Sequence, residues 1–458
     1  MFCQLEILRD CLPSSVRRFL EELPESLDET YERVLREIKK PNRIYAQRLL
    51  QCLVVATRPL RVKELAEILA IDFDDAKEVP KLNANWRWED QERALLTSCS
   101  SLIAIVDTGD SRVAQFSHFS VKEYLTSARL AKSRQDISRY YIALKPAHTI
   151  LGQACVSVLL QLGGDGEPDE VEKSAPHHPD EVEKNADKVE KNAPLARYAA
   201  EYWVCHAQFE DVVSCIRGIK YLFDLDKPYF SAWRRLCDID VKPSYGDAFF
   251  QLNYGPKPRE GTSLYYAVLC GFADLVEQLI IKYPQHVNAI GGHYMTPAVA
   301  ALAKRHFELA QLLHRKGSSV EPRGSYKDTP LHSAVLHGDL EVVQILLDCG
   351  ADIDCLDRFG GTPLHYASRN GHRNAPSIAR LLIERGADPN ARGFDGFTPL
   401  HNASYYGRME IARILIEHGA NVEAKDDDGK TPLDVAPGDR RDDVIRLYRK
   451  LFLELSAK

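Results

Sequence analysis

The sequence predicts a mainly α-helical protein in two parts: a helical domain with one short β-hairpin, followed by a solenoid of stacked helical repeats. Three observations support this prediction. A Thr-Pro-Leu-His string returns at a nearly fixed spacing in the C-terminal half. Apolar residues at helical spacing run through much of the N-terminal half. A charged segment without leucine, isoleucine or aromatic residues separates the two halves.

Length and composition set the class of protein. A chain of 458 residues is longer than one hydrophobic core usually serves, so several domains are expected. No apolar run approaches the roughly 20 residues that span a bilayer, and the N-terminus lacks the basic start and cleavage site of a signal peptide. The eleven cysteines lie mostly in apolar helical patterns, which favours buried, reduced thiols. We therefore expect a cytoplasmic protein, with a nuclear location also open.

The N-terminal part is predicted to contain a helical segment over residues 1–42 and a helical domain with following helices over residues 43–162. Ser26-Leu27-Asp28-Glu29 forms a capping box, in which the serine hydroxyl and the glutamate carboxylate satisfy free amides at a helix start. Thr57-Arg58-Pro59 ends a later helix, because proline cannot continue one. The helices expected from these signals cover residues 30–38, a stretch ending at Val55, a stretch beginning at Leu60, and residues 88–98.

A β-hairpin is expected later in the same domain. Residues 102–106 and 113–116 are mostly apolar and include the β-branched Ile103, Ile105, Val106 and Val113, and a turn containing Gly109 joins the two runs. Ser120-Val121-Lys122-Glu123 is a second capping box, which predicts a helix over residues 121–131. Three helices, a two-stranded wing and a following helix together give a winged-helix-like order.

An acidic low-complexity linker is predicted over residues 163–194. It contains ten Asp or Glu and four Lys, a net charge of −6 out of the −7 of the whole chain. Low hydrophobicity with high charge cannot offset the loss of chain entropy on folding, so disorder is expected there. A helical segment or cap is predicted to follow over residues 195–254.

The repeats supply the most specific signal. Strong copies of the string begin at Thr329, Thr362, Thr398 and Thr431, spaced by 33, 36 and 33 residues, and weaker copies begin at Thr296 and Thr262. Threonine caps a helix start, proline suits its first turn, and glycine allows the left-handed turn after it. About six repeats are therefore expected over residues 255–458.

Two departures from the repeat pattern carry predictions of their own. Three extra residues in the Thr362 repeat predict a longer turn between its helices, at residues 372–377. Arg305 stands where the Thr296 repeat should have its inter-helix glycine, which puts the helix geometry there in question.

The repeat pattern closely resembles the ankyrin repeat. The N-terminal region resembles the end of a NACHT-type signalling ATPase with its winged-helix domain, as in fungal NACHT-ankyrin (STAND-type) proteins. That second resemblance rests on Leu23 to Leu35, on Arg58-Pro59-Leu60, and on His118 to Leu125. Because no complete Gly-x-x-x-x-Gly-Lys-Ser/Thr loop occurs in this chain, the resemblance implies such a protein without its nucleotide-binding core, with residues 1–42 as a helical remnant of the NACHT-type C-terminal region.

Resemblance to ankyrin proteins implies a non-catalytic scaffold or adaptor that binds a protein partner through the concave face. Contacts are then expected at the hairpin tips and at the exposed ends of each first helix, where the aromatic residues should form one stripe. The predicted partner-binding residues are Tyr326, Leu336, His337, Arg358, Phe359, Arg369, Asn370, Phe394, Asp395, Phe397, Tyr405 and Tyr406.

No catalytic, cofactor-binding or metal site is predicted, because no phosphate-binding loop, Gly-x-Ser-x-Gly elbow or zinc-ligand spacing occurs. We expect no small-molecule substrate and no membrane partner. Two alternatives stay open: a fragment of a NACHT-type signalling ATPase whose motor lies upstream, and DNA binding by the winged helix. Twelve basic residues against twelve acidic residues over 43–129 disfavour DNA binding, which needs an excess of cations.

Overall fold

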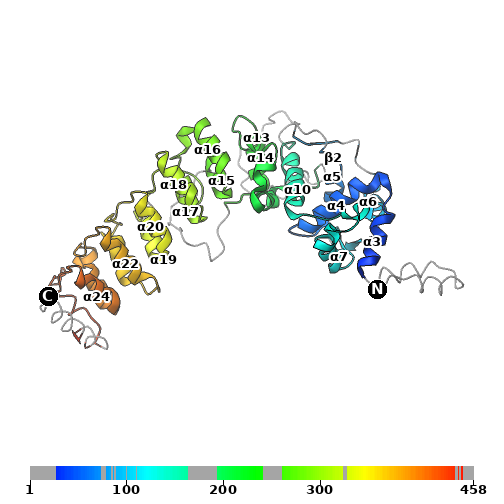
Figure 1. Cartoon of the computed structure of the whole chain (residues 1–458). Coiled ribbons are helices and arrows are strands. Elements are labelled where there is room, and N and C mark those ends of the chain that lie inside the picture. Colours follow the sequence, from blue (N-terminus) through cyan, green and yellow to red (C-terminus); the bar gives the residue numbers. More distant parts are fainter. Residues whose placement is uncertain are drawn as a thin grey trace. The chain divides into compact units, whose positions relative to one another are not determined.

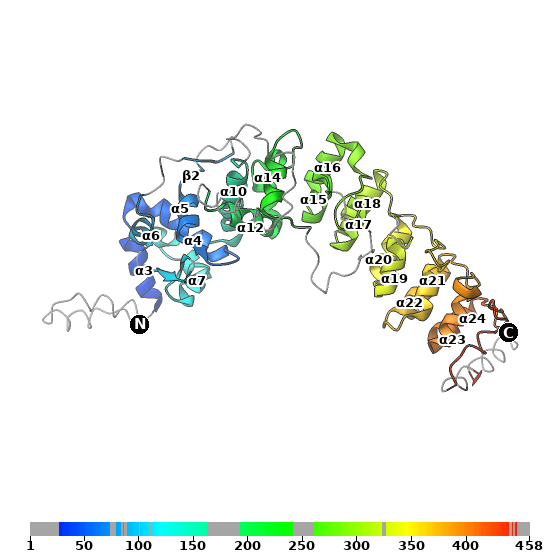
Figure 2. The ribbon, with the colours of Figure 1, turned by 180° about the vertical axis from the view of Figure 1, so that it is seen from behind.

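The computed structural model describes residues 27–73, 79–83, 86, 89–99, 101–109, 111–162, 193–240, 260–322, 327–438, 442 and 445–446. They belong to two compact units, Met1–Ile239 and Asp240–Lys458 (Figures 1 and 2). The described chain is mainly helical with small sheets, which confirms the predicted fold class. No helix among these residues is long and apolar enough to cross a membrane. Residues 163–192 of the predicted linker lie outside the described ranges.

The first unit opens with a helical domain that carries a three-stranded antiparallel sheet. Strand β5 lies in the middle, with Ala114 opposite both Leu60 of β1 and Ile105 of β4. The predicted hairpin is present, and β1 adds an edge strand to it. The elements are α3 (Leu27–Glu37), α4 (Arg43–Val55), β1 (Leu60–Arg61), α5 (Val62–Leu69), α6 (Gln91–Cys99), β4 (Ile103–Asp107) and β5 (Arg112–Phe116).

Leu60 was expected inside a helix, and this expectation was wrong. The residue pairs with β5, and α5 begins only at Val62. The Glu64 carboxylate sets that start, because it accepts the Arg61 amide at 2.7 Å and thereby caps the helix. A second short sheet pairs β2 (Ile71–Asp72) with β3 (Lys81–Leu82).

Two other helix starts differ from the predictions because another side chain caps the helix. Asp90 accepts the Arg93 amide at 3.0 Å, so α6 begins after the predicted residue 88. The predicted helix over 121–131 is two helices, α7 (Phe119–Leu125) and α8 (Ala128–Ala131), and Ser127 caps the second. Ser120 does not cap α7; its hydroxyl hydrogen-bonds to Tyr31 and to His118, at 2.6 Å each.

The helices predicted as a cap after the linker belong to the first unit, where α12 packs along α10. Their core is aromatic: the Trp203 and Trp233 rings meet edge-on at 5.3 Å, and the Trp233 indole donates to the Ala200 carbonyl at 3.1 Å. The elements are α10 (Leu144–Leu159), α12 (Ala196–Gln208), η4 (Phe209–Cys215), α13 (Ile219–Leu222) and α14 (Tyr229–Leu236).

The second unit is a row of helix pairs that follow one another in sequence order (Figures 1 and 2). The described residues contain five pairs, and the threonine of the repeated string lies at the N-cap of each first helix. Most of the sixth repeat lies outside the described residues. The pairs are α15 (Ser263–Cys270) with α16 (Ala273–Lys282), α17 (Pro297–Ala303) with α18 (Phe307–Arg315), α19 (Pro330–His337) with α20 (Leu340–Asp348), α21 (Pro363–Arg369) with α22 (Ala375–Glu384), and α23 (Pro399–Tyr405) with α24 (Met409–Glu417).

Of the two departures from the repeat pattern, one lengthens the turn between the helices and the other leaves the helix pair unchanged. The turn between α21 and α22 covers residues 370–374, against 338–339 in the preceding repeat. It begins before the predicted residue 372 because α21 ends at Arg369, and it ends before the predicted residue 377 because residues 375–377 form the first turn of α22. Arg305 adopts a φ of 59° and so makes the left-handed turn that glycine makes elsewhere, which preserves the helix pair.

Candidate functional site

A buried threonine–histidine pair begins the first helix in three consecutive repeats. In the Thr362 repeat, the Thr362 amide donates to His365 Nδ1 at 3.1 Å. His365 Nε2 lies 3.0 Å from the Phe397 carbonyl of the next repeat. A carbonyl can only accept, so Nε2 carries the proton and the ring is neutral. Burial accordingly lowers the pKa of His365.

The other two pairs repeat this geometry. His332 Nε2 lies 3.0 Å from the Gly361 carbonyl, and His401 Nε2 lies 3.1 Å from the Lys430 carbonyl. Each histidine therefore joins its own helix start to the hairpin of the next repeat. This fixes the spacing of the hairpin tips and of the exposed helix ends, where partner contacts were predicted.

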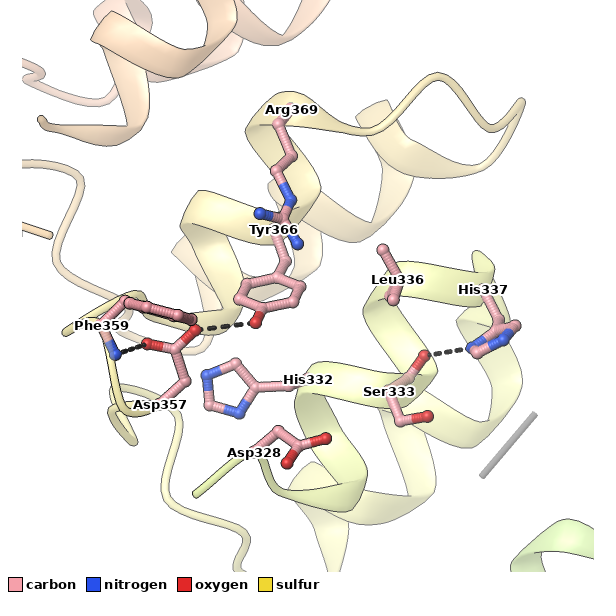
Figure 3. Close-up of a pocket in the computed structure, with 9 residues that line it drawn as sticks. All are labelled: Asp328, His332, Ser333, Leu336, His337, Asp357, Phe359, Tyr366 and Arg369. Carbon is pink, nitrogen blue, oxygen red and sulfur yellow. Dashed lines mark hydrogen bonds between the residues drawn. The ribbon is translucent and has the colours of Figure 1, made fainter. Parts of the chain in front are cut away.

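Asp357 organises the hairpin that precedes α21. One of its carboxylate oxygens accepts the amides of Phe359 and Gly361, at 2.8 Å each. The other accepts the Tyr366 hydroxyl at 2.7 Å (Figure 3). Burial, together with this bond to a carboxylate, raises the pKa of Tyr366, so the phenol stays protonated. The hairpin thus holds the Phe359 ring at its tip, where it is 49% exposed.

An open hollow of about 300 Å³ lies between α19, this hairpin and α21 (Figure 3). The Arg369 guanidinium lies over the Tyr366 ring, 4.1 Å from its centroid. The hollow brings together four of the predicted partner-binding residues, Leu336, His337, Phe359 and Arg369. The residues that line it are Asp328, His332, Ser333, Leu336, His337, Asp357, Phe359, Tyr366 and Arg369.

Two pairs of the predicted aromatic residues form ring contacts, and Arg358 lies against one of these rings. The Phe359 and Phe394 rings meet edge-on at 5.9 Å, which joins neighbouring hairpin tips. Arg358 lies over Phe359 at 4.6 Å. The Tyr405 and Tyr406 rings meet edge-on at 5.0 Å at the end of α23. That all of these side chains form one continuous stripe stays a prediction.

Three predicted residues make contacts between repeats. The Asn370 amide group donates to the carbonyls of Val335 and Leu336, at 3.1 and 2.6 Å. The Phe397 carbonyl lies 3.0 Å from His365 Nε2 of the preceding repeat, and the half-buried Phe397 ring stacks on His401 of its own repeat. The Asp395 carbonyl accepts the Asp427 amide at 3.0 Å. Tyr326 lies outside the described residues.

Sequence reasoning missed Tyr366 and Asp357, which shape the hollow. One signal could have found the aspartate, because an Asp lies five residues before the repeat threonine at both Asp357 and Asp426. Asp426 also caps its hairpin, accepting the amides of Asp428 and Lys430 at 3.0 and 2.8 Å. Across the described ranges, no group of three or more His, Cys, Asp or Glu side chains is arranged to hold a metal ion.

Two protein families match this chain, one in each unit. The family "Ankyrin repeats (3 copies)" matches residues 264–357, 298–393, 332–426 and 374–450. The family "GPI inositol-deacylase, winged helix domain" matches residues 31–135. These matches confirm the predicted ankyrin repeats and winged-helix domain.

One curated relative is similar to much of the chain. The azaphilone pigments biosynthesis cluster protein L of Monascus ruber is 30% identical to it over 316 residues. The alignment covers 66% of this chain and 61% of that protein, which is less than two thirds of the relative's length.

Proposed function

We propose that this chain is a non-catalytic scaffold or adaptor that binds a partner protein through its ankyrin repeats. One observation carries the proposal: five large apolar or aromatic side chains are 40–62% exposed at hairpin tips and first-helix ends of neighbouring repeats. Exposed aromatic residues at such positions commonly supply most of the energy of an interface. The five residues are Leu336, Phe359, Phe394, Tyr405 and Tyr406.

The comparisons support this proposal in two ways. Ankyrin solenoids present an extended concave surface, and such surfaces are used for binding. The name of the Monascus relative refers to a pigment biosynthesis cluster, so proteins encoded in such a cluster are the first partners to test.

The test is capture of partners by the full chain after chemical cross-linking in native extract. One variant carries Phe359→Ser, Phe394→Ser, Tyr405→Ser and Tyr406→Ser. A matched control carries Ile281→Ser and Ile290→Ser, which remove apolar side chains that are 80% and 60% exposed in earlier repeats. We expect the parent and the control to capture the same partner and the fourfold variant to lose it. Equal capture by all three would contradict the proposal.

The winged-helix match supports a second candidate function, that of part of a NACHT-type receptor in which the repeats sense a ligand. Such a receptor needs a phosphate-binding loop to hold its nucleotide. Sequencing full-length transcripts of the locus tests this candidate. A complete Gly-x-x-x-x-Gly-Lys-Ser/Thr loop upstream of these residues and in the same reading frame would support it, and the absence of such a loop from every transcript would eliminate it.

A further inference from the structure

The hollow between α19 and α21 indicates the chemistry of the partner. We propose that it receives a segment of the partner protein in which an Asp or Glu side chain stands beside a bulky apolar one. The carboxylate meets Arg369, and the apolar side chain covers Leu336 and Phe359. This inference rests on the proposed function and adds to it the class of segment that is bound.

Arg369 is the anchor for the carboxylate. Its side chain is exposed at the rim of the hollow, and its guanidinium is positioned by the Tyr366 ring at 4.1 Å. The Tyr366 hydroxyl is in turn held by Asp357 at 2.7 Å (Figure 3). In the part of the chain that the structure describes, no ion pair is found for Arg369. A planar guanidinium held in this way is suited to bind a carboxylate through two hydrogen bonds.

The accessible charge at the mouth of the hollow is positive, although two carboxylates also line it. Asp357 is only 8% exposed, and both its oxygens already accept hydrogen bonds from the hairpin and Tyr366. Asp328 is half-buried. Arg369 is exposed at the rim, and the exposed Arg358 lies over the ring of Phe359, which lines the hollow. Charge complementarity therefore favours an acidic segment over a basic one.

The apolar part of the site lies beside this charge. Leu336 is 40% exposed on one wall, and Phe359 stands at the hairpin tip. Arginine and tyrosine next to exposed apolar side chains are typical of residues that dominate interface energies. The volume of about 300 Å³ accommodates side chains from a short segment rather than a large ligand.

The experiment selects short random peptides against the full chain and then measures their binding by fluorescence anisotropy. We expect enrichment of Asp or Glu next to Leu, Ile or Phe. Arg369→Glu should weaken the selected peptides by about tenfold or more, because attraction becomes repulsion. Asp328→Asn should bind them at least as tightly as the parent, because it removes a like charge. The matched control Arg380→Glu makes the same charge change at an exposed position of α22 and should bind unchanged.

Three results would overturn the inference. The first is enrichment of Lys or Arg, with binding lost in Asp328→Asn, which would indicate a basic occupant. The second is equal binding of acidic peptides by the parent and Arg369→Glu. The third is selection of no peptide, or of peptides without acidic residues. Successful partner capture together with any of these would leave the proposed function standing. Thermal unfolding verifies the fold of each variant, and Arg369→Gln replaces Arg369→Glu if that variant unfolds.

Discussion

The contacts that stabilise the first unit join residues much farther apart in the sequence than the contacts that stabilise the repeat unit. In the first unit, the Leu195 amide donates to buried Glu67 at 2.6 Å across 128 residues, and the Thr57 amide donates to the Tyr198 hydroxyl across 141. In the repeat unit, the His365 bond to Phe397 crosses only 32 residues. A unit closed by distant contacts should unfold as a whole, whereas a row of repeats can lose order locally.

Buried histidine also differs between the units. In the repeats, each histidine of the repeated string bonds to backbone groups of its own and the next repeat. In the first unit, His206 Nδ1 lies 2.9 Å from His148 Nδ1, and His206 Nε2 lies 2.9 Å from the Tyr198 hydroxyl. This chain of side chains connects α10 and α12 to Thr57, at the end of α4. A change at His206 should therefore reach distant parts of the first unit.

The largest expected effect is that of Trp203→Ala. Trp203 is fully buried against Trp233 and Phe223, and removing a buried aromatic side chain costs about 3–5 kcal/mol of unfolding free energy. We expect hydrogen exchange to show lost protection throughout the first unit and unchanged protection in the repeats. Loss of protection confined to α12 and its neighbours would show that the first unit does not unfold as a whole.

Leu364→Ala is the matched change in the repeats. Leu364 is fully buried in α21, and its truncation should cost about 2–4 kcal/mol. The expected loss of hydrogen-exchange protection centres on α21 and the adjacent helix pairs, because each repeat contacts only its neighbours. The first unit should keep its protection. Equal loss of hydrogen-exchange protection in both units would contradict the expectation that the repeats lose order locally.

This difference in range also explains which features could be predicted from the sequence. The repeat helices follow from a string that caps, starts and ends each helix within a few residues, so local signals sufficed. Strand β1 exists only because Leu60 pairs with Ala114, which lies far along the chain, and no local pattern indicates it. Phe359 and Arg369, which line the hollow, were predicted from the sequence as partner-binding residues, but the hollow itself was not predicted. The bond from Tyr366 to Asp357 that positions Arg369 depends on the folded hairpin.

Lowering the pH should also distinguish the two units, with a smaller change in the free energy of unfolding. Burial, with His148 adjacent, lowers the pKa of His206 to about 4. The folded protein keeps this ring neutral, while the unfolded chain takes up a proton near pH 6.5. The contribution of the neutral His206 ring to the free energy of unfolding is therefore complete above about pH 6.5 and is lost as the pH falls towards 4. Between pH 7 and pH 5 the first unit should lose about 2 kcal/mol of stability on this account.

Tryptophan fluorescence during urea unfolding measures this loss in the first unit alone, because all four tryptophans lie before residue 240. His206→Gln keeps polar atoms at the site without a group that titrates in this range. Its stability should change less between pH 7 and pH 5 than that of the parent. An identical pH dependence in both proteins would show that other groups are responsible.

The smallest expected effect concerns the turn at Arg305, which has a φ of 59° where neighbouring repeats have Gly271 and Gly338 at 75° and 76°. Arg305 also forms ion pairs with Asp339, at 2.7 Å, and with Glu341 of the next repeat. Arg305→Ala removes the ion pairs and keeps the strained backbone, whereas Arg305→Gly removes both. Because a side chain in the left-handed region costs about 1 kcal/mol, the glycine variant should be more stable than the alanine variant by that amount.

Relative to the parent, the glycine variant should change little, because exposed ion pairs contribute roughly 0.2–1 kcal/mol each and the relief of strain offsets their loss. Thermal unfolding monitored by far-ultraviolet circular dichroism measures all three proteins. Equal stability of the alanine and glycine variants would mean that the turn relaxes when Arg305 is replaced. The left-handed conformation would then depend on the ion pairs to Asp339 and Glu341, and the next repeat would determine the shape of this turn.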